Sequence, residues 1–175
     1  MIILGIDPGV TVGAALLDTD RRVCEWSAQT TDSLLDRLPF GAAGQVVAEL
    51  WINYGRPPGE GSRLAIGQAY WLQRERGAHM LSRPDVIRAL GMAGSVGKSA
   101  VWGEVVRLLG SDQRGKLCPR RGRKKHQAGW PAQPCELCGG SGWQRAPGPL
   151  AHVKGHARDA LGLAVAYALR EGLMI

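Results

Sequence analysis

The chain has 175 residues, of which 45% are hydrophobic, and it carries a formal net charge of +7. This length suits one domain with a substantial apolar core. No apolar run is long enough to span a bilayer, Met1 leads directly into the first predicted strand, and the four cysteines are too unevenly placed for a secreted disulfide framework. The composition therefore predicts a cytoplasmic protein that does not associate with a membrane.

The positive charge is concentrated in one segment. Between residues 112 and 154 the chain has nine lysines or arginines and two acids, whereas the two signs balance elsewhere. Such a density favours binding to a polyanion such as DNA or RNA through counterion release, and a solvated basic loop is the alternative. Most of the basic residues lie within 114–125: Arg114, Lys116, Arg120, Arg121, Arg123, Lys124 and Lys125.

The first element is a short buried strand over residues 2–7, which ends at the turn Asp7-Pro8-Gly9. Residues 11–18 predict a returning strand, so that the two form a hairpin. Asp7 then lies at the end of the first strand. At that place an aspartate either takes part in chemistry or only caps the turn.

Two further strands and a short helix are expected next. Residues 22–29 alternate between apolar and polar types and predict a strand, and residues 33–38 predict a short helix. A second buried strand is predicted over 45–51, with Glu49 near its end. Because burial of an unpaired carboxylate is costly, Glu49 should face a cation or water.

The middle of the chain predicts a loop, a helix and a strand. Residues 53–61 are rich in glycine and proline and indicate a loop, which Trp51 and Tyr54 border. A helix is predicted over 63–76 and ends at Gly77, and a short strand follows over 78–82.

The glycine-rich segment 94–99 leads into a helix that runs to about residue 109. It is not a P-loop, because Met92 stands where that pattern needs glycine and residues 85–90 do not resemble a buried strand. Lys98 in the first helical turn opposes the helix dipole. A nearby anion such as phosphate would explain Lys98 better than helix stability does, and a surface lysine without a role is the alternative.

Regular periodicity is lost between residues 110 and 150. Cys135 and Cys138 have the spacing of two thiolates that bind one structural zinc ion, and Cys118 and His126 are the nearest candidates for the remaining ligands. Zinc would supply folding energy to a segment with few apolar residues. Free cytosolic thiols are the alternative.

The last predicted element is a helix over 154–169. His156 and Asp159 are three residues apart and share the face of its first turns. The packed side of the helix is formed by Leu161, Val165, Ala168 and Leu169. An aspartate in a first helical turn is also what the helix dipole favours, so Asp159 alone indicates little.

Taken together, these segments resemble the RuvC family of Holliday-junction resolvases, which has the ribonuclease H fold. The resemblance covers most of the chain outside the basic insert at about 112–154. It implies an α/β fold with a mixed sheet flanked by helices, in a single nuclease domain, 1–175, that an irregular and zinc-binding insert interrupts. It rests on IILGIDPG at 2–9, the Glu49 strand, AIGQAYWL at 65–72, GSVGKSAVWGEVVRLL at 94–109 and HARDALGLAVAYAL at 156–169.

The resemblance implies a function and a set of site residues. By position, Asp7, Glu49, His156 and Asp159 match the family's metal-binding tetrad, and Lys98 matches a basic residue used at the scissile phosphate. Carboxylates with one imidazole can hold two Mg²⁺ ions per site, with Mn²⁺ as a substitute. The family also implies a homodimer that nicks a four-way DNA junction symmetrically, with Trp51 or Tyr54 stacked on an unpaired base.

The chain departs from the family's pattern in three places. The stretch from Asp7 to Glu49 is short, the loop after Glu49 differs, and the basic insert suggests a phage or mobile-element variant that acts in the cytoplasm of its bacterial host. We expect the insert to contact DNA. A nuclease for flaps, forks and Y-shaped DNA and a non-catalytic DNA-binding module remain as alternatives. A sugar-kinase-like or actin-like ATPase would need two such hairpin domains, for which 175 residues are too few.

Overall fold

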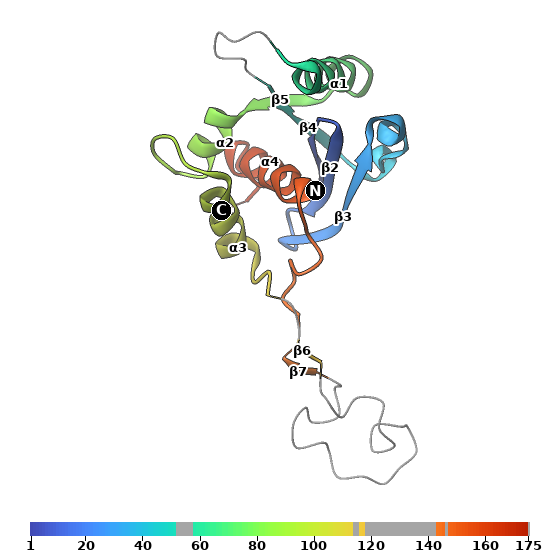
Figure 1. Cartoon of the computed structure of the whole chain (residues 1–175). Coiled ribbons are helices and arrows are strands. Elements are labelled where there is room, and N and C mark those ends of the chain that lie inside the picture. The colour runs from blue at the N-terminus through green and yellow to red at the C-terminus, as the bar shows by residue number, and fades with distance from the viewer. Residues whose placement is uncertain (52–57, 114–115, 118–142, 146, 175) are drawn as a thin grey trace, which may run out of the picture.

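Five strands form the central sheet in the order β3-β2-β1-β4-β5 (Figure 1). The computed structural model describes residues 1–51, 58–113, 116–117, 143–145 and 147–174. Strand β1 pairs antiparallel with β2 and parallel with β4, so the sheet is mixed, as the sequence predicts. The strands are β1 (Ile2–Asp7), β2 (Thr11–Asp18), β3 (Val23–Thr31), β4 (Gln45–Leu50) and β5 (His79–Ser82).

Helices cover both faces of this sheet. Because side chains alternate along a strand, Leu4 and Ile6 pack in one core with Leu72 of α1, whereas Ile3 packs in the other with Leu161 of α4. Helices α2, α3 and α4 lie together on one side of the sheet in Figure 1. The helices are α1 (Glu60–Arg76), α2 (Arg83–Ala89), α3 (Lys98–Leu109) and α4 (His156–Arg170), with two 3-10 helices, η1 (Asp32–Arg37) and η2 (Phe40–Ala42).

Helix α4 lies directly on β1 and β2. A Cβ atom at Gly5 would overlap with the backbone carbonyl of Ala160, and one at Gly13 would overlap with that of His156. The sequence predicts an amphipathic helix here, but every residue from Ala160 to Ala168 is buried. The reason is that α2 and α3 cover the side of α4 that faces away from the sheet.

Helix α2 is absent from the sequence prediction. It has a capping box, in which the Ser82 backbone N–H donates to Asp85 Oδ2 over 3.0 Å, and it has Pro84 in its first turn. A helix of seven residues is too short to show a clear apolar period, so only these capping residues indicate it.

Other predicted elements differ in type or in their ends. The short helix predicted over 33–38 is the 3-10 helix η1, and α1 begins at Glu60, three residues earlier than predicted. Within the ranges described above, no helix combines the length and the hydrophobicity that crossing a membrane requires.

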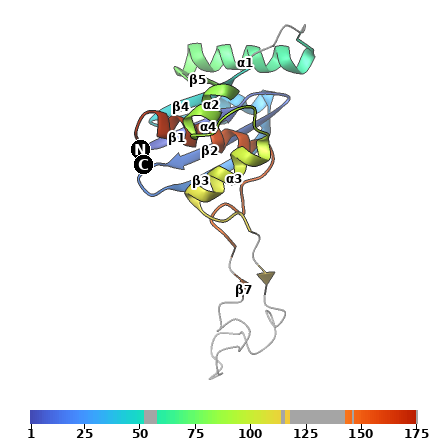
Figure 2. The ribbon, with the colours of Figure 1, turned by 90° about the vertical axis from the view of Figure 1, so that its left-hand side faces the viewer.

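The described residues of the basic insert pair with one another in two antiparallel places (Figures 1 and 2). The Gly148 N–H donates to Gln113 O over 2.9 Å, and the Leu150 N–H donates to Ser111 O over 3.0 Å. Farther out, β6 (Lys116–Leu117) pairs antiparallel with β7 (Trp143–Arg145), although the sequence predicts no regular structure there. We call residues 110–113 and 147–150 the insert root.

Several predicted site residues lie outside the described residues, and the zinc site and most of the basic cluster stay predictions for that reason. Lys116 of β6 is described in its backbone only. The residues outside are Tyr54, Arg114, Cys118, Arg120, Arg121, Arg123, Lys124, Lys125, His126, Cys135 and Cys138.

Candidate active site

The two predicted strand acids lie at the same end of the sheet. Asp7 shares the α4 side of β1 with Ile3 and Gly5, because side chains of a strand alternate between its faces. On the parallel strand β4, Ala48 is opposite Ile6, so Glu49 follows at the level of Asp7. Asp7 is only 5% exposed, so its carboxylate is held inside the protein at the strand end.

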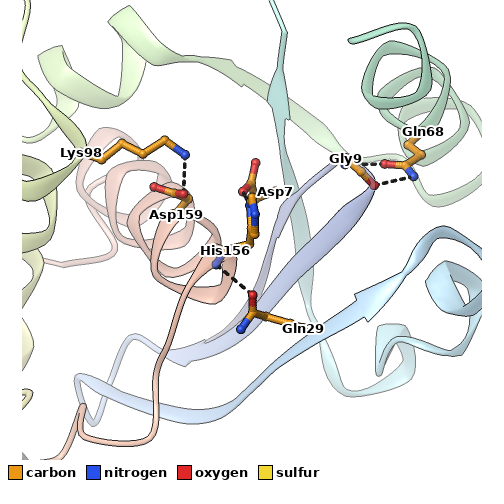
Figure 3. Close-up of polar contacts among 7 residues, drawn as sticks. All are labelled: Asp7, Gly9, Gln29, Gln68, Lys98, His156 and Asp159. Atoms are coloured by element: carbon orange, nitrogen blue, oxygen red, sulfur yellow. Dashed lines mark hydrogen bonds and ion pairs between the residues drawn. The ribbon is translucent and has the colours of Figure 1, made fainter. Parts of the chain in front are cut away.

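The first turns of α4 bring two more predicted residues to Asp7. His156 Nδ1 lies 2.8 Å from Asp7 Oδ2, and Asp159 follows one helical turn later (Figure 3). One potential ligand atom from each of Asp7, His156 and Asp159 lies within 4.8 Å of the others. These three residues therefore form a compact set that can hold a cation, and Glu49 lies beside the set, next to Asp7.

Lys98 reaches this set from the first turn of α3. Its Nζ donates to Asp159 Oδ2 over 2.6 Å (Figure 3). Burial alone would lower the pKa of Lys98, but the hydrogen bond and charge of Asp159, together with Asp7 and Glu49, raise the pKa above its usual value. The anion expected beside Lys98 is thus the Asp159 carboxylate in this structure, and the side chain of Lys98 remains 65% exposed.

Glu49 is partly buried and lies near other carboxylates. Burial, with smaller contributions from the Asp7 and Asp159 carboxylates, raises the pKa of Glu49 to about 8 against the effect of Lys98. Three carboxylates and one imidazole in a half-buried place are the donor set that divalent cations such as Mg²⁺ and Mn²⁺ prefer. The residues present therefore fit a divalent metal site.

Gln68 of α1, for which the sequence predicts no role, holds the turn that follows Asp7. Its Oε1 accepts from the Gly9 N–H over 2.7 Å, and its Nε2 donates to Gly9 O over 3.1 Å and to Asp32 Oδ1 over 2.6 Å (Figure 3). Gln68 is 4% exposed. In the sequence, the signal for such a role is a polar residue at a position that shares the buried side of the helix with Ala65, Ala69 and Leu72.

Gln29 is a second positioning residue without a sequence prediction. Its Oε1 accepts from the His156 backbone N–H over 3.3 Å, so β3 also contacts the start of α4 (Figure 3). Gly155, which precedes His156, has a φ of 50° and leaves no room for a Cβ atom beside Gln29. No local pattern links two residues so far apart in the chain.

Of the two residues predicted to stack on a base, Trp51 and Tyr54, only Trp51 is among the described residues. Trp51 follows β4 two residues after Glu49 and is 42% exposed. Its position leaves the indole accessible to a ligand at the same end of the sheet as Asp7 and Glu49.

Comparison with models of protein families and with curated proteins found no match. Among solved structures, the Thermus thermophilus RuvC structure aligns with a TM-score of 0.59 over 99% of this chain and 98% of that chain, at 18% sequence identity. T. thermophilus RuvC in complex with Holliday junction substrate aligns with a TM-score of 0.57 over 99% and 96%, at 16% identity. The protein therefore has a RuvC-like fold of the ribonuclease H type, and at this identity the likeness concerns the fold alone.

Proposed function

We propose that this protein is a structure-selective endonuclease that resolves four-way DNA junctions by metal-dependent hydrolysis of phosphodiester bonds. The observation that carries the proposal is the convergence of Asp7, His156 and Asp159 at the end of a RuvC-like sheet. One similar structure is described as a complex with Holliday junction substrate, which supports branched DNA as the substrate.

Asp7, His156, Asp159 and the adjacent Glu49 would hold two Mg²⁺ ions, or Mn²⁺ in their place. Bound divalent cations supply a more acidic water and stabilise negative charge on a reacting phosphate. Glu49 must lose its proton to serve as a ligand. Because its pKa is about 8, metal binding must displace a proton, and metal affinity should rise as pH increases to about 8.

Two of the chain's own contacts prepare the site for a phosphate. Lys98 Nζ sits 2.6 Å from Asp159, so its positive charge lies where a phosphate beside the metal ligands would carry its charge. The contact between Asp7 and His156 Nδ1 sets the orientation of the imidazole ring. Both contacts hold their side chains in place, which lowers the cost of ordering these side chains during the reaction.

Several further parts of the proposal concern how the DNA is held. Two copies of the chain would nick opposite strands of one junction as a homodimer. The exposed Trp51, with Tyr54, would stack on an unpaired base, and the basic insert, with its zinc-bound cysteines, would contact DNA phosphates.

The test is cleavage of a labelled synthetic four-way junction with Mg²⁺. The wild type should give paired, symmetric nicks, whereas Asp7→Asn and Asp159→Asn should give none. Both variants should still bind the junction when Ca²⁺ replaces Mg²⁺, because the basic residues remain. Retained cleavage by either variant would contradict the assigned metal ligands.

Parallel reactions on Y-shaped and linear DNA separate the alternatives. Equal cleavage of all three substrates would support a less selective nuclease for branched DNA. Junction binding without cleavage, in Mg²⁺ and in Mn²⁺, would support a non-catalytic DNA-binding module.

A further inference from the structure

Arg158 lies on α4 between the two proposed metal ligands of that helix, and its guanidinium is held in place by three contacts. Its Nε donates to Val153 O over 3.3 Å, and its Nη2 donates to Asp112 Oδ2 over 3.4 Å. Its guanidinium carbon lies 4.7 Å from the centroid of the Trp102 ring. Stacking on an indole and two hydrogen bonds together fix the plane of this group.

The same contacts join three separate parts of the chain. Trp102 Nε1 donates to Asp112 Oδ2 over 2.7 Å, so one carboxylate oxygen binds both the indole and the guanidinium. Trp102 belongs to α3, Arg158 belongs to α4, and Asp112 belongs to the insert root. Arg158 is therefore positioned relative to both helices and to the start of the basic insert.

Arg158 lines a groove that runs from the candidate active site. The groove has a volume of about 470 Å³ and lies between the first turns of α3 and α4. Lys98, Ser99 and Trp102 line it from α3, and His156, Arg158 and Asp159 line it from α4. Since Lys98, His156 and Asp159 belong to both the groove and the site, a ligand in the groove would adjoin the reacting centre.

The groove lining carries two cations, Lys98 and Arg158, and one carboxylate, Asp159, which pairs with Lys98. Lys98 and Arg158 both lie in first helical turns, where a cation opposes the helix dipole. The side chain of Arg158 is 42% exposed, and the contacts described above use only its Nε and Nη2 among the five N–H donors of a guanidinium. A planar guanidinium with free donors is well suited to a phosphate.

We propose that this groove binds a DNA phosphate next to the scissile one, with Arg158 as the contact residue and Trp102 and Asp112 as its positioning residues. The inference rests on the proposed function, because the ligand is the strand that the active site would cut. It adds a phosphate subsite formed by the insert root together with α3 and α4.

The experiment pairs a change in the protein with a change in the DNA. Single neutral methylphosphonates replace, one at a time, the phosphates on either side of the crossover of a four-way junction. Binding is measured with Ca²⁺ in place of Mg²⁺, and cleavage is measured with Mg²⁺. At one flanking position the wild type should lose affinity about tenfold, and Arg158→Gln should no longer respond to that replacement.

Three further variants separate phosphate contact from a structural role. Arg158→Lys keeps the charge and should retain part of the response. Trp102→Phe keeps a ring but removes the hydrogen bond to Asp112, so the response should weaken while the protein stays folded. Arg107→Gln is the matched control, since Arg107 is exposed on α3, pairs with Glu104 and does not line the groove. This control should respond like the wild type.

The outcomes for the two proposals can be told apart. If the methylphosphonate lowers the affinity of Arg158→Gln by the same factor as that of the wild type at every position, Arg158 contacts none of these phosphates. The proposed phosphate subsite is then wrong, even where the junction is cut. If the wild type binds the junction but never cuts it, the nuclease proposal fails, and the binding measurements still decide the subsite. Absence of junction binding would overturn both.

Discussion

The two faces of the central sheet are built in different ways. On the α4 face, Gly5 and Gly13 let the helix backbone lie against the strands, and charged residues gather at the sheet end. On the α1 face, side chains such as Leu4 and Ile6 separate helix from sheet, and Gln68 is the polar residue that reaches the hairpin turn. The site geometry should therefore depend on the α4 face, whereas the α1 face should mainly supply stability.

The largest loss of stability is expected on the α1 face. Leu72 is fully buried, so Leu72→Ala should lower the free energy of unfolding by about 2–5 kcal/mol through lost transfer energy and a cavity. Where the variant is folded, its Mn²⁺ affinity should equal that of the wild type. Denaturant unfolding and Mn²⁺ titration check this, with Leu72→Met as the control that keeps the volume. Loss of metal affinity in folded Leu72→Ala would contradict the division between faces.

A smaller change on the α4 face should harm the site more. The added methyl group of Gly13→Ala would overlap with the His156 backbone, so the start of α4 must shift, at a cost of about 1–3 kcal/mol. Mn²⁺ affinity should fall sharply because His156 and Asp159 move with that turn. Gly103→Ala in α3 is the control, since among the described residues nothing outside its own helical turn lies within 4 Å of the new methyl group. Unchanged Mn²⁺ affinity of Gly13→Ala would contradict the dependence of the metal ligands on the packing of α4 against Gly13.

Gln68 links the two faces, and its removal should have an intermediate effect. Gln68→Ala leaves the buried polar groups around Gly9 without a partner and should cost about 1–2 kcal/mol. Metal affinity should fall moderately, because the turn after Asp7 loosens. Gln68→Glu would place a carboxylate against Asp32, and Asp32→Asn in the same chain should restore part of the stability. Equal stability of Gln68→Glu with and without Asp32→Asn would contradict the contact between Gln68 and Asp32.

A pH dependence of stability caused by Glu49 is also expected. Its pKa in the folded protein is about 8, well above its ordinary value, so the fold favours the protonated form. Without divalent metal, stability should therefore fall as pH rises from about 4.5 to about 8. Thermal unfolding in EDTA, measured over this pH range for the wild type and for Glu49→Gln, checks this. The variant should lose the part of the pH dependence of stability that Glu49 causes. Parallel pH profiles for both proteins would contradict the assignment to Glu49.

The sequence alone determined the elements whose periodicity is local. Alternation and turn residues predicted the hairpin with Asp7 at its end, and the apolar spacing predicted α3 and α4 with Lys98 and His156 in their first turns. The ordered set of segments also predicted the RuvC-like fold that the comparison with solved structures confirms. These features follow from neighbours within a few residues along the chain, which a sequence pattern records directly.

Only the tertiary structure decided which side chains meet. Lys98 was expected beside an anion, but Asp159, which is 61 positions away in the chain, became its partner only when α3 and α4 packed together. The contact of Gln68 with Gly9 and that of Arg158 with Asp112 likewise join distant segments. Such pairs depend on how α1, α3, α4 and the insert root pack, and no local periodicity encodes that packing.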